Sequence, residues 1–156
     1  MPIPAFIETL RTKIGHDLLW LSGVSGVVLD DHGRILLTRR ADSGRWAVVS
    51  GIIEPGEQPA PALIREIAEE TGVVAETDRL VSVVSLEPKL CPNGDRVQFL
   101  DLTFACRYMS GTARVADDEN LEVGWFDPSS LPDMNLNNRT RIERTLAGGR
   151  VTYFQP

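Results

Sequence analysis

The spacing of hydrophobic positions predicts a chain in which strands and helices alternate. Apolar residues at near-helical spacing indicate a short amphipathic helix over residues 4–14. The Val-rich segment 18–29 and the segment 34–40 flank a polar turn, and this pattern is typical of two strands in a hairpin. Further extended segments are expected over residues 46–50, 73–87, 96–109, 121–126 and 151–154.

Two more helices are expected, and they define the fold class. The first covers residues 59–71, because Pro59 and Pro61 suit a first turn and Gly72 suits the C-terminal cap. The second covers residues 138–147 and ends at a pair of glycines. Strands on both sides of a central helix, with helices near the ends, favour an α/β sandwich with a mixed sheet.

Length and composition predict one globular domain over residues 1–156, of which residues 1–17 form an N-terminal helical extension. Hydrophobic residues make up 42% and charged residues 24%, as in ordinary globular proteins. Cys91 and Cys106 show no CxxC spacing, which favours two free thiols in a reducing cytoplasm. The start of the chain lacks the basic and apolar regions of a signal peptide.

Charge and hydropathy narrow the classes of partner. The formal net charge of −6 argues against a nucleic-acid partner and against an anionic membrane surface. No apolar run approaches the length of a membrane span. A small polyphosphate substrate remains compatible with this charge, because bound metal ions can supply the positive charge.

The chemistry of the chain is concentrated in residues 51–73, which read GIIEPGEQPAPALIREIAEETGV. Leu63 and Ile67 form an apolar stripe of the expected helix that should face the core. Three glutamates at positions i, i+3 and i+4 are expected to share another face: Glu66, Glu69 and Glu70.

A face with three carboxylates is expected to bind a cation. Each like-charge pair at helical spacing costs a few tenths of a kcal/mol, which a divalent ion would offset. Hard oxygen ligands without nearby Cys or His favour Mg²⁺, with Mn²⁺ as the alternative. The expected chemistry is attack of a metal-activated water on phosphorus, while the metal neutralises charge on the leaving phosphate.

The whole spacing is far more specific than an acidic helix face. Its chance occurrence is on the order of one in a billion per window at average residue usage. The pattern resembles the box that defines the Nudix hydrolases. That resemblance implies an α/β/α sandwich and hydrolysis of a nucleoside diphosphate linked to another group X. The nine specified positions are Gly51, Glu57, Arg65, Glu66, Ile67, Glu69, Glu70, Gly72 and Val73.

The resemblance also implies roles for single residues of the box. Arg65 should orient the carboxylates by ion pairing, with Glu57 as the expected partner. Ser50 departs from the family pattern, which usually has glycine there, so the backbone before the box is expected to differ modestly. The implied metal ligands are the carbonyl of Gly51 and the carboxylates of Glu66, Glu69 and Glu70.

Residues outside the strict box complete the expected site. Many family members add a carboxylate from a loop before the later Trp strand, and Asp117, Asp118, Glu119 and Glu122 all precede Trp125. Glu119 is the chosen further metal ligand or general base, and Glu69 is the alternative base. The expected substrate-binding residues are Arg40, Arg45 and Glu54, with the two arginines suited to phosphate.

Two functional hypotheses follow from these residues. The first is a diphosphate hydrolase that acts on a small nucleotide, either a nucleotide sugar such as ADP-ribose or a nucleoside triphosphate. The alternative is a nucleotide-binding regulator with the same fold and little turnover. By analogy with the family, a homodimer is expected.

Overall fold

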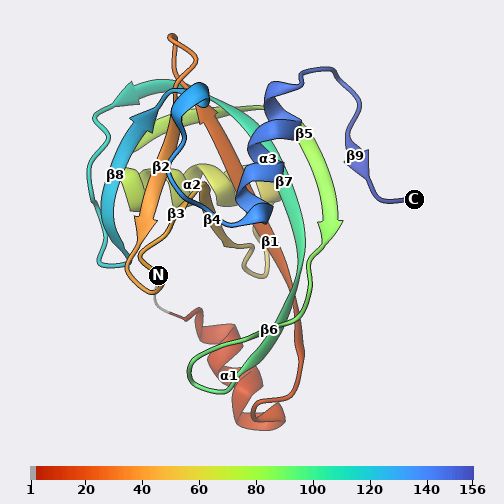
Figure 1. The fold of residues 1–156 in the computed structure, drawn as a ribbon. Helices are drawn as coiled ribbons and strands as arrows, with labels where there is room; N and C mark the ends of the chain where they lie inside the picture. The colour runs from red at the N-terminus through yellow and green to blue at the C-terminus, as the bar shows by residue number, and fades with distance from the viewer. Residues whose placement is uncertain (1–2) are drawn as a thin grey trace.

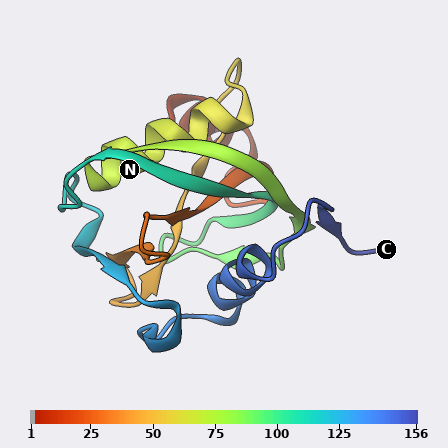
Figure 2. The same cartoon turned by 90° about the horizontal axis from the view of Figure 1, so that it is seen from above.

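The computed structural model describes residues 3–156, so the first two residues of the expected N-terminal extension lie outside the described part. Within this range a nine-stranded mixed sheet lies between α2 and α3 (Figures 1 and 2), which confirms the expected α/β/α sandwich. The elements are α1 (Ala5–Ile14), β1 (Leu19–Leu29), β2 (Ile35–Arg40), β3 (Trp46–Ala47), β4 (Val49–Ile52), α2 (Pro59–Thr71), β5 (Val73–Ser85), β6 (Lys89–Leu90), β7 (Arg96–Gly111), β8 (Asn120–Phe126), a 3-10 turn (Pro128–Ser130), α3 (Leu136–Leu146) and β9 (Tyr153–Phe154).

Strand β1 organises the sheet. It runs parallel to β7 along its whole length and antiparallel to β4, and β7 in turn pairs with β5. The expected hairpin of β1 and β2 is present, and Leu29 of β1 pairs with Ile35 of β2. Beyond that pair β2 lies between β3 and β8 instead, because β4 occupies the edge of β1 that a longer hairpin would use.

The segment expected as one strand over residues 46–50 is two strands, so that prediction was wrong in detail. Strand β3 pairs with β2, whereas β4 pairs with β1 and continues to Ile52, two residues beyond the expected end. Val48 separates the two strands, and its N–H donates to Oδ1 of Asn138 in α3 at 3.3 Å. The change of partner strand therefore occurs at a residue that is held by a side chain of α3.

Helix α2 has the span expected from the sequence, Pro59–Thr71. Gly72 ends it with a φ of 69°, and its N–H donates to the carbonyl of Ala68. Leu63 and Ile67 are fully buried against the sheet. A Cβ at Gly26 of β1 would lie 3.0 Å from Cδ1 of Leu63, so the glycine lets the helix approach the strand closely.

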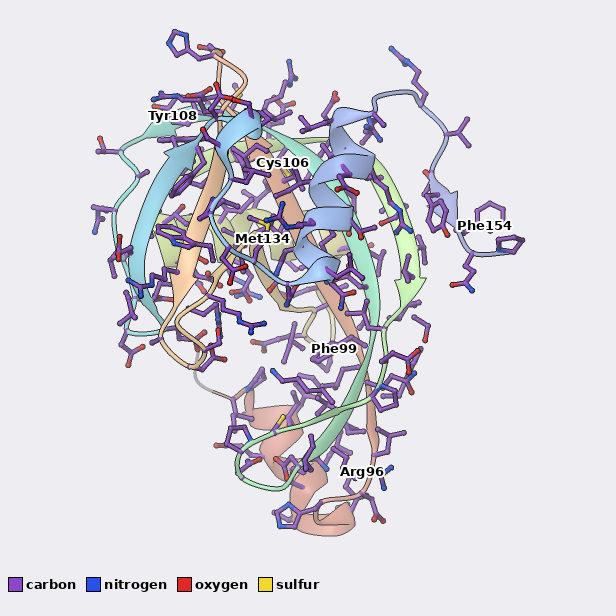
Figure 3. All side chains as sticks on the ribbon, viewed as in Figure 1. Arg96, Phe99, Cys106, Tyr108, Met134 and Phe154 are labelled. Carbon is purple, nitrogen blue, oxygen red and sulfur yellow. The ribbon has the colours of Figure 1, made fainter. Side chains whose placement is uncertain are left out.

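Helix α3 packs on the opposite face of the sheet (Figure 2). It begins two residues earlier than expected, at Leu136, because the Asn135 side chain caps it by accepting from the N–H of Asn138. Ile142 anchors its apolar side in a cluster that includes Met134, a residue labelled in Figure 3. A partly buried ion pair also ties the helix to β7, with Arg141 Nε 3.0 Å from Asp101 Oδ2.

Helix α1 lies at the lower end of the long β1–β7 ribbon in Figure 1, apart from α2 and α3. Its Ile7 packs in a cluster with Leu21 of β1 and Val97 of β7. At the other side of the molecule, β9 runs beside the edge of β5, and Phe154 projects away from the body (Figure 3). None of the helices in residues 3–156 combines the length and apolar character needed to span a membrane.

Candidate active site

Arg65 lies in the middle of α2 and pairs with three glutamates of the box. Its Nε and Nη2 donate to the two carboxylate oxygens of Glu57 at 2.8 and 2.9 Å, which is a two-pronged ion pair. Its Nη1 reaches Glu66 at 2.9 Å and Glu69 at 3.2 Å. The expected Arg65–Glu57 pair is therefore present, and the same guanidinium also contacts two of the proposed metal ligands. This pairing lowers the pKa of Glu57.

Glu66 of α2 lies against the backbone of Gly51 in β4. The Glu66 side chain is 1% exposed. A Cβ at position 51 would lie 2.4 Å from both Cγ and Cδ of Glu66, a separation that no real side chain could occupy. Glycine is therefore required at this position by space, since φ of Gly51 is not in the left-handed region. The contact places a carboxylate beside the backbone of the box's first residue.

Glu70 meets the loop before β8 on the buried side of α2. Its Oε2 accepts a hydrogen bond from Asn120 Nδ2 at 3.1 Å, while Oε1 is buried and has no hydrogen-bond partner among the described residues. Carboxylate oxygens of Glu70, Asp117 and Glu119 lie within 4.8 Å of one another. Arg40 donates to Glu119 Oε2 at 3.2 Å. This arrangement is a carboxylate cluster that a cation could enter.

Burial dominates the electrostatics of the two buried glutamates. It raises the pKa of Glu70 from 4.5 to about 7, and the Asn120 hydrogen bond and the charge of Arg40 only partly oppose this. Burial also raises the pKa of Glu66, against the lowering effect of Arg65. Without a cation, the fold therefore favours the protonated form of both carboxyls more than an unfolded chain would.

The raised pKa of Glu70 predicts that the free energy of unfolding of the metal-free protein depends on pH. The folded pKa of about 7 lies above the ordinary 4.5, so folding takes up a proton in this window. The contribution of this group to the free energy of unfolding is at its maximum below pH 4.5 and falls as the pH rises towards 7. The Glu70→Gln variant should therefore gain stability over wild type across that window, by up to about 3 kcal/mol. Denaturant unfolding in EDTA at several pH values measures this gain.

The matched control for the pH experiment is Glu122→Gln, which makes the same chemical change at a side chain that is 54% exposed. Because Glu122 contacts solvent and pairs with Arg39, this change should give no gain in stability over wild type. A Glu70→Gln variant that likewise showed no gain would contradict the raised pKa of Glu70.

Glu69 is more exposed than the other two glutamates of α2, although helical spacing places all three near one another. Its side chain is 55% exposed and pairs with Arg65, whereas Glu66 and Glu70 are buried. The same Nη1 of Arg65 contacts both Glu66 and Glu69. The structure also brings Glu70 together with Asp117 and Glu119.

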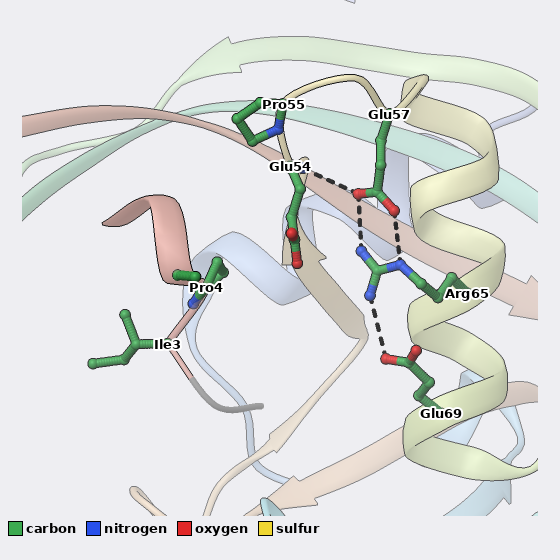
Figure 4. Close-up of a pocket in the computed structure, with 8 residues that line it drawn as sticks. Ile3, Pro4, Glu54, Pro55, Glu57, Arg65 and Glu69 are labelled. Carbon is green, nitrogen blue, oxygen red and sulfur yellow. Dashed lines mark hydrogen bonds and ion pairs between the residues drawn. The ribbon is translucent and has the colours of Figure 1, made fainter. Parts of the chain in front are cut away.

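The expected substrate-binding residues fall in two places. Arg40 lies beside the carboxylate cluster, where it pairs with Glu119 and lies 3.6 Å from Asp42. Arg45 is exposed directly before β3, and its carbonyl accepts from the N–H of Arg40. Glu54 instead lines an open hollow of about 490 Å³ beside Arg65 and Glu69 (Figure 4).

Ser50 occupies ordinary extended backbone. It pairs with Ser25 in the β4–β1 ladder, and no non-glycine residue in the described chain has a positive φ. The strained backbone that glycine would relieve is therefore absent at this position. Serine fits here because β4 continues as a regular strand through it.

Asp117 and Asn120 complete the cluster, and sequence reasoning gave neither a specific role. Asn120 Nδ2 bridges the two acids, donating to Glu70 at 3.1 Å and to Asp117 at 3.0 Å. The position of Asn120 directly after Glu119 was the feature of the sequence that could have indicated its role. What could not be foreseen was the contact itself, because it joins residues 50 positions apart.

The chain matches the model of the NUDIX domain over residues 20–146. This match covers most of the chain, and the chain therefore belongs to the Nudix superfamily. The matched segment contains the box, the carboxylate cluster and α3, and it begins within β1, after α1.

Proteins of known sequence and structure support the same family. The chain is 34% identical over 110 residues to a MutT-like protein of Streptomyces ambofaciens, covering 70% of this chain and 66% of that protein. It is 33% identical over 112 residues to the human 8-oxo-dGDP phosphatase NUDT18, covering 70% of this chain but only 33% of that protein. The crystal structure of a MutT NUDIX hydrolase from Burkholderia pseudomallei superposes with a TM-score of 0.69 at 28% identity, covering 81% of this chain and 98% of that one.

Proposed function

We propose that this protein is a divalent-metal-dependent hydrolase that cleaves a diphosphate linkage in a nucleoside diphosphate joined to another group X. The observation that carries the proposal is the buried Oε1 of Glu70, which has no hydrogen-bond partner among residues 3–156 although Asp117 and Glu119 lie beside it. An unpaired buried carboxylate oxygen is costly, and a cation would offset that cost.

The residues present fit a hard divalent cation. The cluster offers carboxylate oxygens, which Mg²⁺ and Mn²⁺ prefer. When bound, such an ion would polarise a phosphoryl oxygen and lower the pKa of a bound water. The proposed ligands are the carbonyl of Gly51 and the carboxylates of Glu66, Glu69, Glu70 and Glu119.

Other side chains would position the reaction. Arg65 holds Glu57, Glu66 and Glu69 in fixed orientations, so we assign it the role of orienting the carboxylates. Arg40 lies at the cluster and Arg45 nearby in sequence, which suits contact with substrate phosphates. Glu119 and Glu69 are the two candidates for the base that takes a proton from the attacking water.

The substrate is proposed as a small nucleotide. The human relative is named for a nucleoside diphosphate, which fits the reaction type but does not choose the group X. A nucleotide sugar such as ADP-ribose and a nucleoside triphosphate both present the required diphosphate linkage. Cytoplasmic location, a single domain and a homodimer remain predictions from the sequence.

A hydrolysis screen tests the proposal directly. Folded protein is incubated with nucleotide sugars and nucleoside triphosphates in Mg²⁺, in Mn²⁺ and in EDTA, and the products are separated by ion-exchange chromatography. We expect a nucleoside monophosphate as one product with either metal and none in EDTA. Activity that persists in EDTA would contradict the metal requirement. Tight nucleotide binding without turnover would support the regulator instead.

A further inference from the structure

Asn120, the first residue of β8, joins parts of the carboxylate cluster that come from different elements. It is 4% exposed and pairs with Arg40 of β2, and α2 lies behind both strands in Figure 1. From this position Nδ2 donates to Oε2 of Glu70 on α2 at 3.1 Å. It also donates to Oδ1 of Asp117 in the preceding loop at 3.0 Å. One amide nitrogen therefore contacts two acids.

The acids beside Asn120 determine the orientation of its amide. Nδ2 donates to both carboxylates, whereas an amide turned by half a rotation would place its own oxygen against them. Oδ1 of Asn120 is buried and has no hydrogen-bond partner among residues 3–156. An unpaired buried acceptor is unfavourable. The arrangement therefore satisfies the two acids while the amide oxygen stays unpaired.

The loop before β8 does not need the Asn120 side chain to stay in place. The N–H of Ala116 donates to the carbonyl of Glu70 at 3.2 Å. The N–H of Ala41 donates to the carbonyl of Glu119 at 2.8 Å. These bonds join backbone groups, so a change of the Asn120 side chain leaves both donors and acceptors present. The contacts of Nδ2 therefore bear on the orientation of carboxyl groups more than on the course of the chain.

The two acids depend on Asn120 to different degrees. Oδ1 of Asp117 also accepts from the N–H of Glu119 at 3.2 Å, so it keeps one donor without Asn120. Oε1 of Glu70 has no partner among the described residues, so the hydrogen bond from Asn120 to Oε2 fixes this carboxylate. Rotation about the last bond of a glutamate side chain is otherwise soft. Loss of Asn120 would therefore affect mainly the orientation of Glu70.

We infer that Asn120 is a positioning residue, which engages Oε2 of Glu70 and leaves Oε1 available to the divalent cation. It acts through Glu70, and the inference rests on the proposed hydrolase function. A neutral donor suits this task because a cationic side chain would compete with the metal ion. An acidic side chain would repel the two carboxylates that Asn120 now joins.

The test measures Mn²⁺ binding by electron paramagnetic resonance, a readout that needs no turnover. Asn120→Ala should weaken Mn²⁺ binding by about 10-fold or more, as the loss of a group that orients a metal ligand typically does. In the Glu70→Gln background the same substitution should change Mn²⁺ binding by less than about twofold, because the group that Asn120 positions is already altered. Asn120→Ser keeps one shorter donor and should cause a smaller loss that likewise disappears in Glu70→Gln.

The matched control is Asn138→Ala, which truncates another asparagine that is 5% exposed. Asn138 lies in α3 on the opposite face of the sheet, where its Nδ2 donates to Oδ1 of Asn135 at 3.0 Å. This variant should lose stability but keep the Mn²⁺ affinity of wild type. Denaturant unfolding in EDTA checks that every variant folds.

The outcomes separate the inference from the proposed function. Wild-type Mn²⁺ affinity in Asn120→Ala and Asn120→Ser would overturn the inference alone. An equal loss with and without Glu70→Gln, or a loss that Asn138→Ala matches, would also overturn it, because the effect would then not pass through Glu70. Absence of both Mn²⁺ binding and hydrolysis in folded wild type would overturn the proposed function together with the inference.

Discussion

Replacing Glu70 by Gln should lower kcat by at least about 100-fold while the protein stays folded. Even residues that only support a metal ligand cost 10- to 100-fold on average, and Glu70 is proposed as a ligand itself. The fold should tolerate the change, because the Gln carbonyl can still accept the hydrogen bond from Asn120. Steady-state kinetics at saturating Mg²⁺, with thermal unfolding on the same samples, measures both effects.

Glu122→Gln is again the matched control, since Glu122 lies on β8 and pairs with Arg39 away from the cluster. It should retain wild-type kcat. Near-wild-type turnover by Glu70→Gln, or a loss that is matched by Glu122→Gln, would refute the assignment of Glu70.

Substituting Gly51 by Ala should damage both stability and turnover. The added Cβ would meet Cγ and Cδ of the buried Glu66, so either the side chain or β4 must shift. Overpacking of this kind costs about 1–3 kcal/mol. A shift of about 1 Å in a group that positions the reaction can cost about 100-fold in rate. Denaturant unfolding and steady-state kinetics of the purified variant measure the two losses.

Ser50→Ala serves as the control for this substitution, because it changes the neighbouring residue of the same strand at an exposed position. We expect stability and kcat close to wild type. If Gly51→Ala behaved like Ser50→Ala, the close contact between Gly51 and Glu66 would not be important for the site.

The elements that the sequence predicted well are those with strong local signals. Helix α2 has its expected bounds because prolines and Gly72 mark its ends, and Leu63 and Ile67 mark its buried side. The boundary between β3 and β4 was missed, because it depends on two different partner strands and on Asn138 of α3. No property of residues 46–50 alone reveals such distant partners.

The candidate site likewise contains some contacts that the sequence predicted and others that it did not. The pairing of Arg65 with Glu57 was expected from the family pattern and is present. The burial of Glu70 against Asn120, and the exposure of Glu69, depend on how α2 is rotated against the sheet and on where the loop before β8 lies. These properties depend on tertiary structure. Helical spacing could therefore predict that the three glutamates lie near one another, but it could not predict which of them are buried.

Helix α1 also bears on how such a protein can diverge. It packs on the ribbon of β1 and β7, whereas the acidic residues of the box lie on α2 and the loop before it, so the two are separate stretches of chain. Descendants could exchange the N-terminal segment while the acidic residues of α2 stay unchanged. The main constraint on such exchange is a side chain equivalent to Ile7, which must keep its place against Leu21 and Val97.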